Sequence, residues 1–156
     1  MINGQASKEY IMSLAQDIEI DFKNALREQN ALKLSVLRML KSALKNEAIA
    51  KKQAELIDEE VIAVLRRELK KRQDSILAFS SAGRNDLADQ EKAEAELIGV
   101  YLPALMAEED IAKIVEEIIA SGVTGFGLVM KEVMSKTNGQ ADGQLVQKLV
   151  KAKLAL

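Results

Sequence analysis

The sequence predicts an all-α fold, and three observations lead to that prediction. Apolar residues recur at helical spacing through most of the chain, strand-like alternation is missing, and Gly and Pro occur almost only where the period breaks. The 156 residues, of which 48% are hydrophobic and 29% charged, suffice for one ordinary domain or two small ones. We therefore expect an N-terminal four-helix part followed by a small C-terminal three-helix bundle.

The first two helices are expected in an N-terminal domain over residues 12–103, after a poorly structured extension at residues 1–11. Helical spacing begins near Met12, where apolar residues occupy every fourth position: Leu14, Ile18, Phe22 and Leu26. The second helix is predicted over residues 31–52. Its apolar side carries Leu37, Leu40, Leu44 and Ala48.

The third and fourth helices complete this domain. Asp58 is predicted to cap the third helix, because its carboxylate can accept the unpaired amides of the first turn, and no breaker interrupts the run to Phe79. That helix should end at Ser80, Ser81 and Gly83. The fourth should start near Asn85 or Asp86, and Pro103 marks the domain boundary because it disfavours helix in the residue before it.

The C-terminal domain is expected over residues 104–156, with helices at residues 107–120, at 126–136 and from Asp142 to the C-terminus. Two Gly-bearing segments, SGVTG and TNGQADG, separate these helices. The glycine-rich stretch GVTGFG lacks the Gly-Lys-Ser/Thr ending of a phosphate-binding P-loop and follows no strand. It is therefore interpreted as a helix terminator and a turn.

The composition excludes several classes of protein chemistry. The chain has no Cys and no His, so disulfides, most zinc sites and most Ser or Cys catalytic triads cannot be assembled. Carboxylates and lysines remain as possible catalysts. No apolar stretch approaches the ~20 residues of a membrane helix, and the N-terminus does not resemble a signal peptide. We expect a soluble cytoplasmic protein without membrane association, metal or cofactor.

Positive charge is local rather than global. The formal net charge is −2, which argues against a globally basic nucleic-acid-binding protein. Residues 31–72, however, hold eleven Lys and Arg against six Asp and Glu, a net charge of +5. Residues 131–153 hold five against two, a net charge of +3. These two stretches are the candidate contacts for a polyanion.

The third helix carries the densest charge in the chain. At about 100° per residue, one arc of this helix holds four cations: Arg66, Arg67, Lys70 and Lys71. Such a face is either solvated or makes phosphate contacts. Arg72 falls in the apolar arc, and Glu68, one turn earlier, is the nearest candidate partner. A structural ion pair between Glu68 and Arg72 is favoured over a polar functional site.

The segment KTNGQADG, Lys136–Gly143, predicts a turn before the last helix. Asp142 is placed to cap that helix, Gly139 can adopt positive φ, and Asn138 suits a turn. The polar side of the last helix then groups Gln144, Gln147, Lys148 and Lys151. A plain capped turn is favoured over an anion site at the helix N-terminus, because Asp142 would oppose an anion.

The fourth helix is strongly acidic. Its carboxylates are those of Asp86, Asp89, Glu91, Glu94 and Glu96. They point around much of the helix circumference, so a solvated face is favoured over a divalent-ion site.

Four phrases, taken together in order and spacing, resemble the GatB/YqeY family. They are Leu34–Ile49, Arg67–Ser75, the Leu-Pro pair after Tyr101, and Gly127–Leu154. The last phrase resembles the tail domain of the B subunit of the tRNA-dependent amidotransferase. The resemblance implies that this stand-alone form carries a tRNA-facing module, while separate subunits perform the glutamine-dependent carbon–nitrogen ligase reaction.

The family motif at the turn is matched at five positions: Lys136, Gly139, Ala141, Gly143 and Lys148. The family often has Lys where this chain has Asn138 or Gln140. The resemblance and the two basic stretches together favour a non-catalytic tRNA-associated module. Lys136, Lys148 and Lys151 would contact phosphates near Gly139 and Gly143, and the arc from Arg66 to Lys71 is a possible second surface.

Two other functions stay open. One is a helical protein–protein interaction module unrelated to RNA, in which the acidic fourth helix and the basic third helix supply complementary faces for a protein partner. The other is an amidotransferase-type enzyme. Such an enzyme needs a Ser or Cys nucleophile held by a base, and an ATP-binding apparatus, and neither is found in the sequence.

Overall fold

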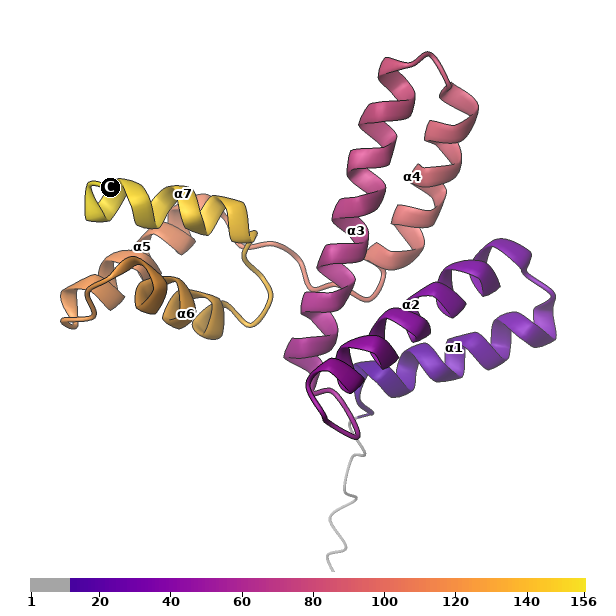
Figure 1. The fold of residues 1–156 in the computed structure, drawn as a ribbon, viewed down its shortest axis with the longest axis horizontal. Coiled ribbons are helices and arrows are strands. Elements are labelled where there is room, and N and C mark those ends of the chain that lie inside the picture. Colours follow the sequence, from indigo (N-terminus) through magenta and orange to yellow (C-terminus); the bar gives the residue numbers. More distant parts are fainter. Residues whose placement is uncertain (1–11) are drawn as a thin grey trace, which may run out of the picture. The chain divides into compact units, whose positions relative to one another are not determined.

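The computed structural model describes residues 12–156, and the described part consists of helices without any strand. Figure 1 shows the order α1 (Leu14–Glu28), α2 (Ala31–Ala50), α3 (Asp58–Ser81), α4 (Asn85–Gly99), α5 (Glu108–Ala120), α6 (Phe126–Thr137) and α7 (Gly143–Leu154). The predicted all-α class, four helices followed by three, is confirmed. The expectation for residues 1–11 lies outside the described residues.

The chain divides into two compact units, the first ending at Tyr101 and the second spanning Leu102–Leu156. In the first unit, α1 lies along α2 and α3 along α4 (Figure 1). Helices α2 and α3 each contact the other three helices of this unit. The buried face of α2 supplies Val36, Leu37, Leu40 and Leu44 to the core. The core is completed by Ile18 and Ala25 of α1, Val61, Val64 and Leu65 of α3, and Ala88 and Ile98 of α4.

The apolar side of α1 differs from the predicted one at its C-terminal end. Leu26 is 45% exposed, and its neighbour Ala25 is fully buried instead. Four residues span about 400°, so a strict repeat of four drifts by about 40° each time. From Leu14 to Leu26 this drift accumulates to about 120°, which carries Leu26 off the core face.

Asp58 does not cap α3 as the sequence predicted. Ile57 holds the N-cap position, and the side chain of Glu60 closes the turn by accepting the Ile57 N–H at 3.1 Å. The Asp58 carboxylate instead accepts the Leu14 N–H at 2.9 Å, at the start of α1. A carboxylate is favourable at the positive end of a helix, so Asp58 stabilises α1 from a neighbouring helix. Ser13 provides the N-cap of α1 itself.

The second unit is a closed three-helix bundle in which α5, α6 and α7 each contact the other two. Its core consists of Ile111, Val115, Ile118, Val129, Val133, Ala141, Val146 and Val150. The segment between Pro103 and α5 is attached to the turn before α7, because the Met106 N–H donates to the Gln140 carbonyl at 2.7 Å. The turn Asn138–Asp142 is thus held by this hydrogen bond and by the packing of Ala141 in the core of the bundle.

Candidate functional site

The basic arc of α3 is largely neutralised by carboxylates of the first unit. Arg67 contacts Glu47 of α2 at 2.6 Å, Lys70 contacts Asp74 at 3.5 Å, and Lys71 contacts Glu68 at 2.6 Å. Arg66 is half-buried and also has a partner. Each of these cations would have to leave a local interaction before it could contact a phosphate.

Arg72 has partners other than the predicted Glu68, and this part of the prediction was wrong. Its guanidinium lies 3.3 Å from Glu91 and 3.3 Å from Glu94, both on α4, and Nη2 lies 3.4 Å from Met39 Sδ of α2. Because Arg72 lies on the apolar arc of α3, it points into the seam between helices, where α4 brings its carboxylates. Glu68 pairs with Lys71 instead.

Arg72 forms ion pairs with Glu91 and Glu94, but its guanidinium is not fully hydrogen-bonded. Its side chain is 21% exposed, and those of Glu91 and Glu94 are 17% and 14% exposed. The buried Nε has no hydrogen-bond partner although Glu94 is close, so this contact is electrostatic rather than a well-aligned hydrogen bond. Two carboxylates against one guanidinium leave no positive charge at the seam for an outside ligand.

The turn before α7 is a capped turn, as the sequence favoured. The Asp142 carboxylate accepts the N–H groups of Gln144 and Leu145, each at 2.9 Å. Asn138 and Gly139 both have positive φ, +46° and +76°, a region where Gly and Asn are tolerated best. Ala141 is 3% exposed and belongs to the core, so the turn is packed as well as capped.

The cap decides between the two interpretations of this helix start. Two first-turn amides that would attract an anion, those of Gln144 and Leu145, already donate to the Asp142 carboxylate. An anion at this corner therefore has to be held by side chains rather than by the helix N-terminus.

The lysines predicted around the turn are exposed and unpaired with carboxylates. Lys136 lies in the last turn of α6, and Lys148 and Lys151 lie on α7, opposite the buried Val146 and Val150. Among residues 12–156, none of the three makes an ion pair. The Lys151 ammonium lies 5.9 Å above the Phe126 ring, an arrangement that leaves its charge uncompensated. Lys153, two residues on, pairs with Glu116.

Gly139 and Gly143 contribute backbone geometry rather than side-chain interactions. The φ of +76° at Gly139 is one that side-chain-bearing residues rarely adopt. Gly143 is the first residue of α7 and is exposed, and a Cβ added there would meet no atom within 4 Å. It leaves the surface beside the cap open.

Several other exposed cations were not predicted from the sequence. Arg38 and Lys45 of α2 and Lys131 of α6 are exposed and make no ion pair within the described part of the chain. A signal for them existed, because none of the three has Asp or Glu three or four residues away on its helix. By contrast, the paired Lys70 and Lys71 do have such acids.

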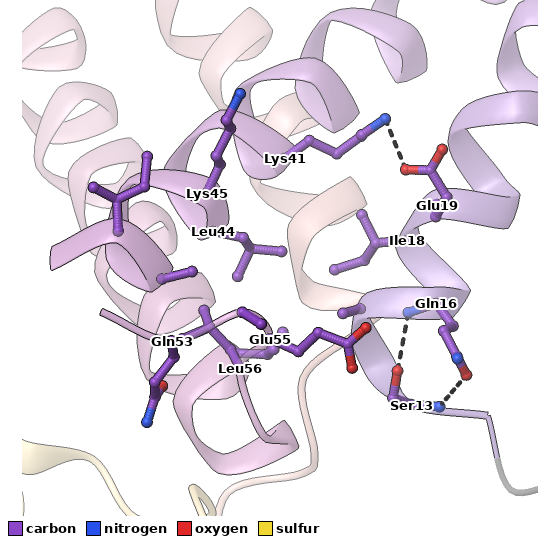
Figure 2. Close-up of a pocket in the computed structure, with 15 residues that line it drawn as sticks. Ser13, Gln16, Ile18, Glu19, Lys41, Leu44, Lys45, Gln53, Glu55 and Leu56 are labelled. Carbon is purple, nitrogen blue, oxygen red and sulfur yellow. Dashed lines mark hydrogen bonds and ion pairs between the residues drawn. The ribbon is translucent and has the colours of Figure 1, made fainter. Parts of the chain in front are cut away.

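A pocket that the sequence did not predict lies in the first unit, between α1, α2 and the loop before α3. Its volume is about 600 Å³. Figure 2 shows Ile18 of α1 and Leu44 of α2 pointing toward each other in its interior. At its rim, Lys41 pairs with Glu19 at 2.7 Å and lies 4.0 Å above the Phe22 ring. This pair holds the pKa of Glu19 below its usual value.

Two further groups of the first unit have altered acidity. The pKa of Glu60 is lowered by its bond to Lys51 and by the Ile57 N–H. The pKa of the Tyr101 hydroxyl is raised by burial and by the Asp21 carboxylate, to which it donates a hydrogen bond. Tyr101 ends the first unit, so this bond fixes the chain where it leaves α4.

The described residues contain no group of three or more Asp or Glu side chains arranged to hold a metal ion. The acidic residues of α4 are accordingly spread over its surface and the seam with α3. In the part of the chain that the structure covers, no helix combines the length and apolarity needed to cross a bilayer.

Comparison with known proteins gives three results. The family model described as "Yqey-like protein" matches residues 15–154. The protein named "Altered inheritance of mitochondria protein 41, mitochondrial" is 29% identical in Pyrenophora tritici-repentis, with 85% of this chain and 76% of the relative covered. The protein of the same name in Candida glabrata is 30% identical, with 78% of this chain and 69% of the relative covered. One subunit of the glutamyl-tRNA(Gln) amidotransferase of Thermococcus gammatolerans is 29% identical over 85 residues, which are 49% of this chain and 14% of that relative.

Proposed function

This chain belongs to the YqeY-like protein family, and we propose that it is a non-catalytic helical module that binds tRNA through its C-terminal unit. The contacts are made by the ammonium groups of Lys136, Lys148 and Lys151 with backbone phosphates. Such contacts give affinity without sequence specificity, which suits recognition of the tRNA body.

One observation carries the proposal: these three lysines are exposed and have no carboxylate partner among the described residues. A cation already paired with a carboxylate gains little by exchanging it for a phosphate, whereas an unpaired one gains the full interaction. The α3 cations, which the sequence offered as a second surface, are engaged locally and are therefore left out of the proposed contact.

The name of one relative supports a role in binding tRNA. The similar protein of Thermococcus gammatolerans is named as a subunit of an amidotransferase that acts on a glutamyl-tRNA. The chain has neither His, the commonest catalytic base, nor the nucleophile Cys, so a binding role is the simpler one. We also propose a compartment that holds tRNA, either the cytoplasm or, as in the fungal relatives' names, mitochondria; fluorescence microscopy of the tagged protein distinguishes them.

Filter binding of bulk tRNA to the full chain tests the proposal. The triple variant Lys136→Glu, Lys148→Glu and Lys151→Glu should bind at least about tenfold more weakly at moderate salt, because each reversed charge removes one phosphate contact. The matched control is Lys113→Glu, a surface cation of the same unit that pairs with Asp110. It should change the affinity by less than about threefold.

The proposal fails if wild-type protein does not retain tRNA even at low salt, or if the triple variant binds as well as wild type. Purified protein that releases glutamate from glutamine would contradict the non-catalytic part separately.

A second candidate function is a protein–protein interaction module, favoured by large apolar side chains exposed on the second unit. Leu105 is 55% exposed and Leu128 is 60% exposed. Apolar side chains of this size at a surface are common but also mark contact sites. A pull-down from extract with and without ribonuclease separates the two functions, because nuclease removes RNA-dependent partners only.

A further inference from the structure

The pocket of the first unit combines an apolar interior with a charged rim. Its lining includes the side chains of Ala15 and Ile18 from α1, and of Leu44 and Ala48 from α2. Its volume of about 600 Å³ is in the range typical of small-ligand sites. A flat, partly apolar group such as a nucleobase fits an interior of this kind, because it can bury its faces against apolar side chains.

The cations at one side of the pocket form a stripe along α2. Arg38, Lys41 and Lys45 fall within an arc of about 60° on the helix, and the last two line the pocket. Arg38 and Lys45 are exposed and make no ion pair among residues 12–156. Figure 2 shows the Lys45 ammonium on the same side of α2 as Lys41, directed away from the apolar interior. Two uncompensated cations thus lie beside an apolar pocket.

The carboxylates of the pocket do not cancel this stripe. Glu19 is already paired with Lys41, at 2.7 Å. Glu55 has no partner in the described part of the chain, and Figure 2 shows it extending from the loop toward α1, on the side of Ser13 and Gln16 rather than of Lys45. A carboxylate beside an amide group is suited to accept N–H groups of a base edge.

We propose that this pocket binds one nucleotide of single-stranded RNA. The base lies over the apolar floor formed by Ile18 and Leu44, its polar edge faces Glu55 and Gln16, and its phosphates lie along Lys45 and Arg38. This site rests on the proposed function, because it adds a second RNA contact to that of the C-terminal unit. A nucleotide ligand also explains why the unpaired cations of α2 lie beside this pocket.

Two substitutions test the pocket in the full chain. Ala54→Trp, at an exposed loop position that lines the pocket, should fill it, and Lys45→Glu should repel the phosphate. Each should weaken binding of a labelled, unstructured eight-nucleotide RNA by at least about fivefold in fluorescence anisotropy. The matched controls Ala82→Trp and Lys70→Glu lie in the same unit outside the pocket and should stay within about twofold.

Nuclear magnetic resonance provides a readout that does not depend on the C-terminal lysines. Titration with the free nucleotides AMP, GMP, CMP and UMP should shift the backbone amides of Ile18 and Leu44 in wild type, and not in Ala54→Trp. If neither a free nucleotide nor the RNA shifts these amides, the pocket proposal is overturned, whatever the tRNA affinity of the C-terminal variants.

If the amides shift with free nucleotides but all four variants bind the RNA equally well, the pocket binds a free nucleotide. The proposal that it binds a nucleotide of an RNA strand is then overturned. If the pocket variants behave as expected while the C-terminal triple variant binds tRNA normally, the pocket stands and the proposed C-terminal contact fails.

Discussion

The cations of α3 and those around the turn that joins α6 to α7 differ in what they contact. Along α3, Arg67, Lys70 and Lys71 each contact a carboxylate, one on a neighbouring helix and two on α3 itself. Around the turn, Lys136 and Lys148 have no such partner among the described residues. The helix with the densest charge in the sequence is therefore the one with less charge to offer a ligand.

This difference shows that charge density is a weak guide to binding and that local compensation matters more. An exposed ion pair contributes little to stability, typically below about 1 kcal/mol, but it occupies the cation. A cation without a carboxylate partner can contact a ligand without first breaking an ion pair. Both sides of the comparison can be tested, from stability at the α3 seam to binding at the C-terminal turn.

The largest effect is expected at the seam between α3 and α4. Arg72→Ala leaves Glu91 and Glu94 without their cation in a largely buried position and should lower the free energy of unfolding by roughly 2–3 kcal/mol, measured by urea denaturation with circular dichroism. The triple variant Arg72→Met, Glu91→Gln and Glu94→Gln should recover most of this loss, because no unpaired charge remains. Equal stability of Arg72→Ala and wild type would show that the seam does not depend on this charge.

A smaller effect is expected at the cap of α7. Asp142→Ala removes the acceptor for two first-turn amides and should destabilise the second unit by about 1 kcal/mol. It also removes a negative charge beside the proposed phosphate contacts, so tRNA affinity should rise slightly despite the lower stability. Asp142→Asn, which keeps a capping oxygen, should raise the affinity without the destabilisation. A fall in tRNA affinity for both variants would argue against phosphate binding at this corner.

Breaking one exposed pair of α3 should have a lesser effect still. Lys70→Gln removes the interaction with Asp74 across one helical turn and should change the free energy of unfolding by less than about 1 kcal/mol. Its tRNA affinity should stay within about twofold of wild type, because this cation is already engaged. A larger decrease of tRNA affinity than of stability would place α3 in the RNA contact after all.

The smallest effect concerns acidity at the start of α3. The pKa of Glu60 is lowered by Lys51 and by the Ile57 N–H, so the ionised form is favoured in the folded state. The resulting stability is present above the usual pKa of a glutamate and is lost as the pH falls through the lowered pKa. Carboxyl-carbon magnetic resonance should find the pKa of Glu60 below the usual value of a glutamate, and Lys51→Ala should raise the pKa of Glu60 toward that value. A pKa of Glu60 that is the same in wild type and in Lys51→Ala would show that the pair does not form in solution.

Much of the fold follows from helical spacing, and the errors other than that at Leu26 share one cause. The spacing predicts seven helices and the cap at Asp142, because both depend on residues close together in the chain. It does not predict that Arg72 pairs with carboxylates of α4, about twenty residues away in the chain. It also does not predict that the Asp58 carboxylate accepts a backbone N–H at the start of α1. Contacts between distant segments depend on packing rather than on local pattern.

The candidate site shows the same division. The sequence identified Lys136, Lys148 and Lys151 and the turn beside them, because these residues and the cap are neighbours in the chain. It did not indicate the pocket between α1, α2 and the following loop, whose walls come from segments that pack together only after folding. The uncompensated cations Arg38 and Lys45 were within reach of sequence reasoning, through the absence of acids one turn away.

The salt dependence of tRNA binding reports which cations of the protein neutralise phosphates. The slope of log affinity against log salt should become shallower by about one for each phosphate that the protein no longer neutralises, so Lys136→Glu, Lys148→Glu and Lys151→Glu together should reduce it by about three. The matched triple variant of α3, Arg67→Glu, Lys70→Glu and Lys71→Glu, should leave the slope nearly unchanged. A flatter slope for the α3 variant, together with an unchanged slope for the C-terminal variant, would place the phosphate contacts on α3 instead.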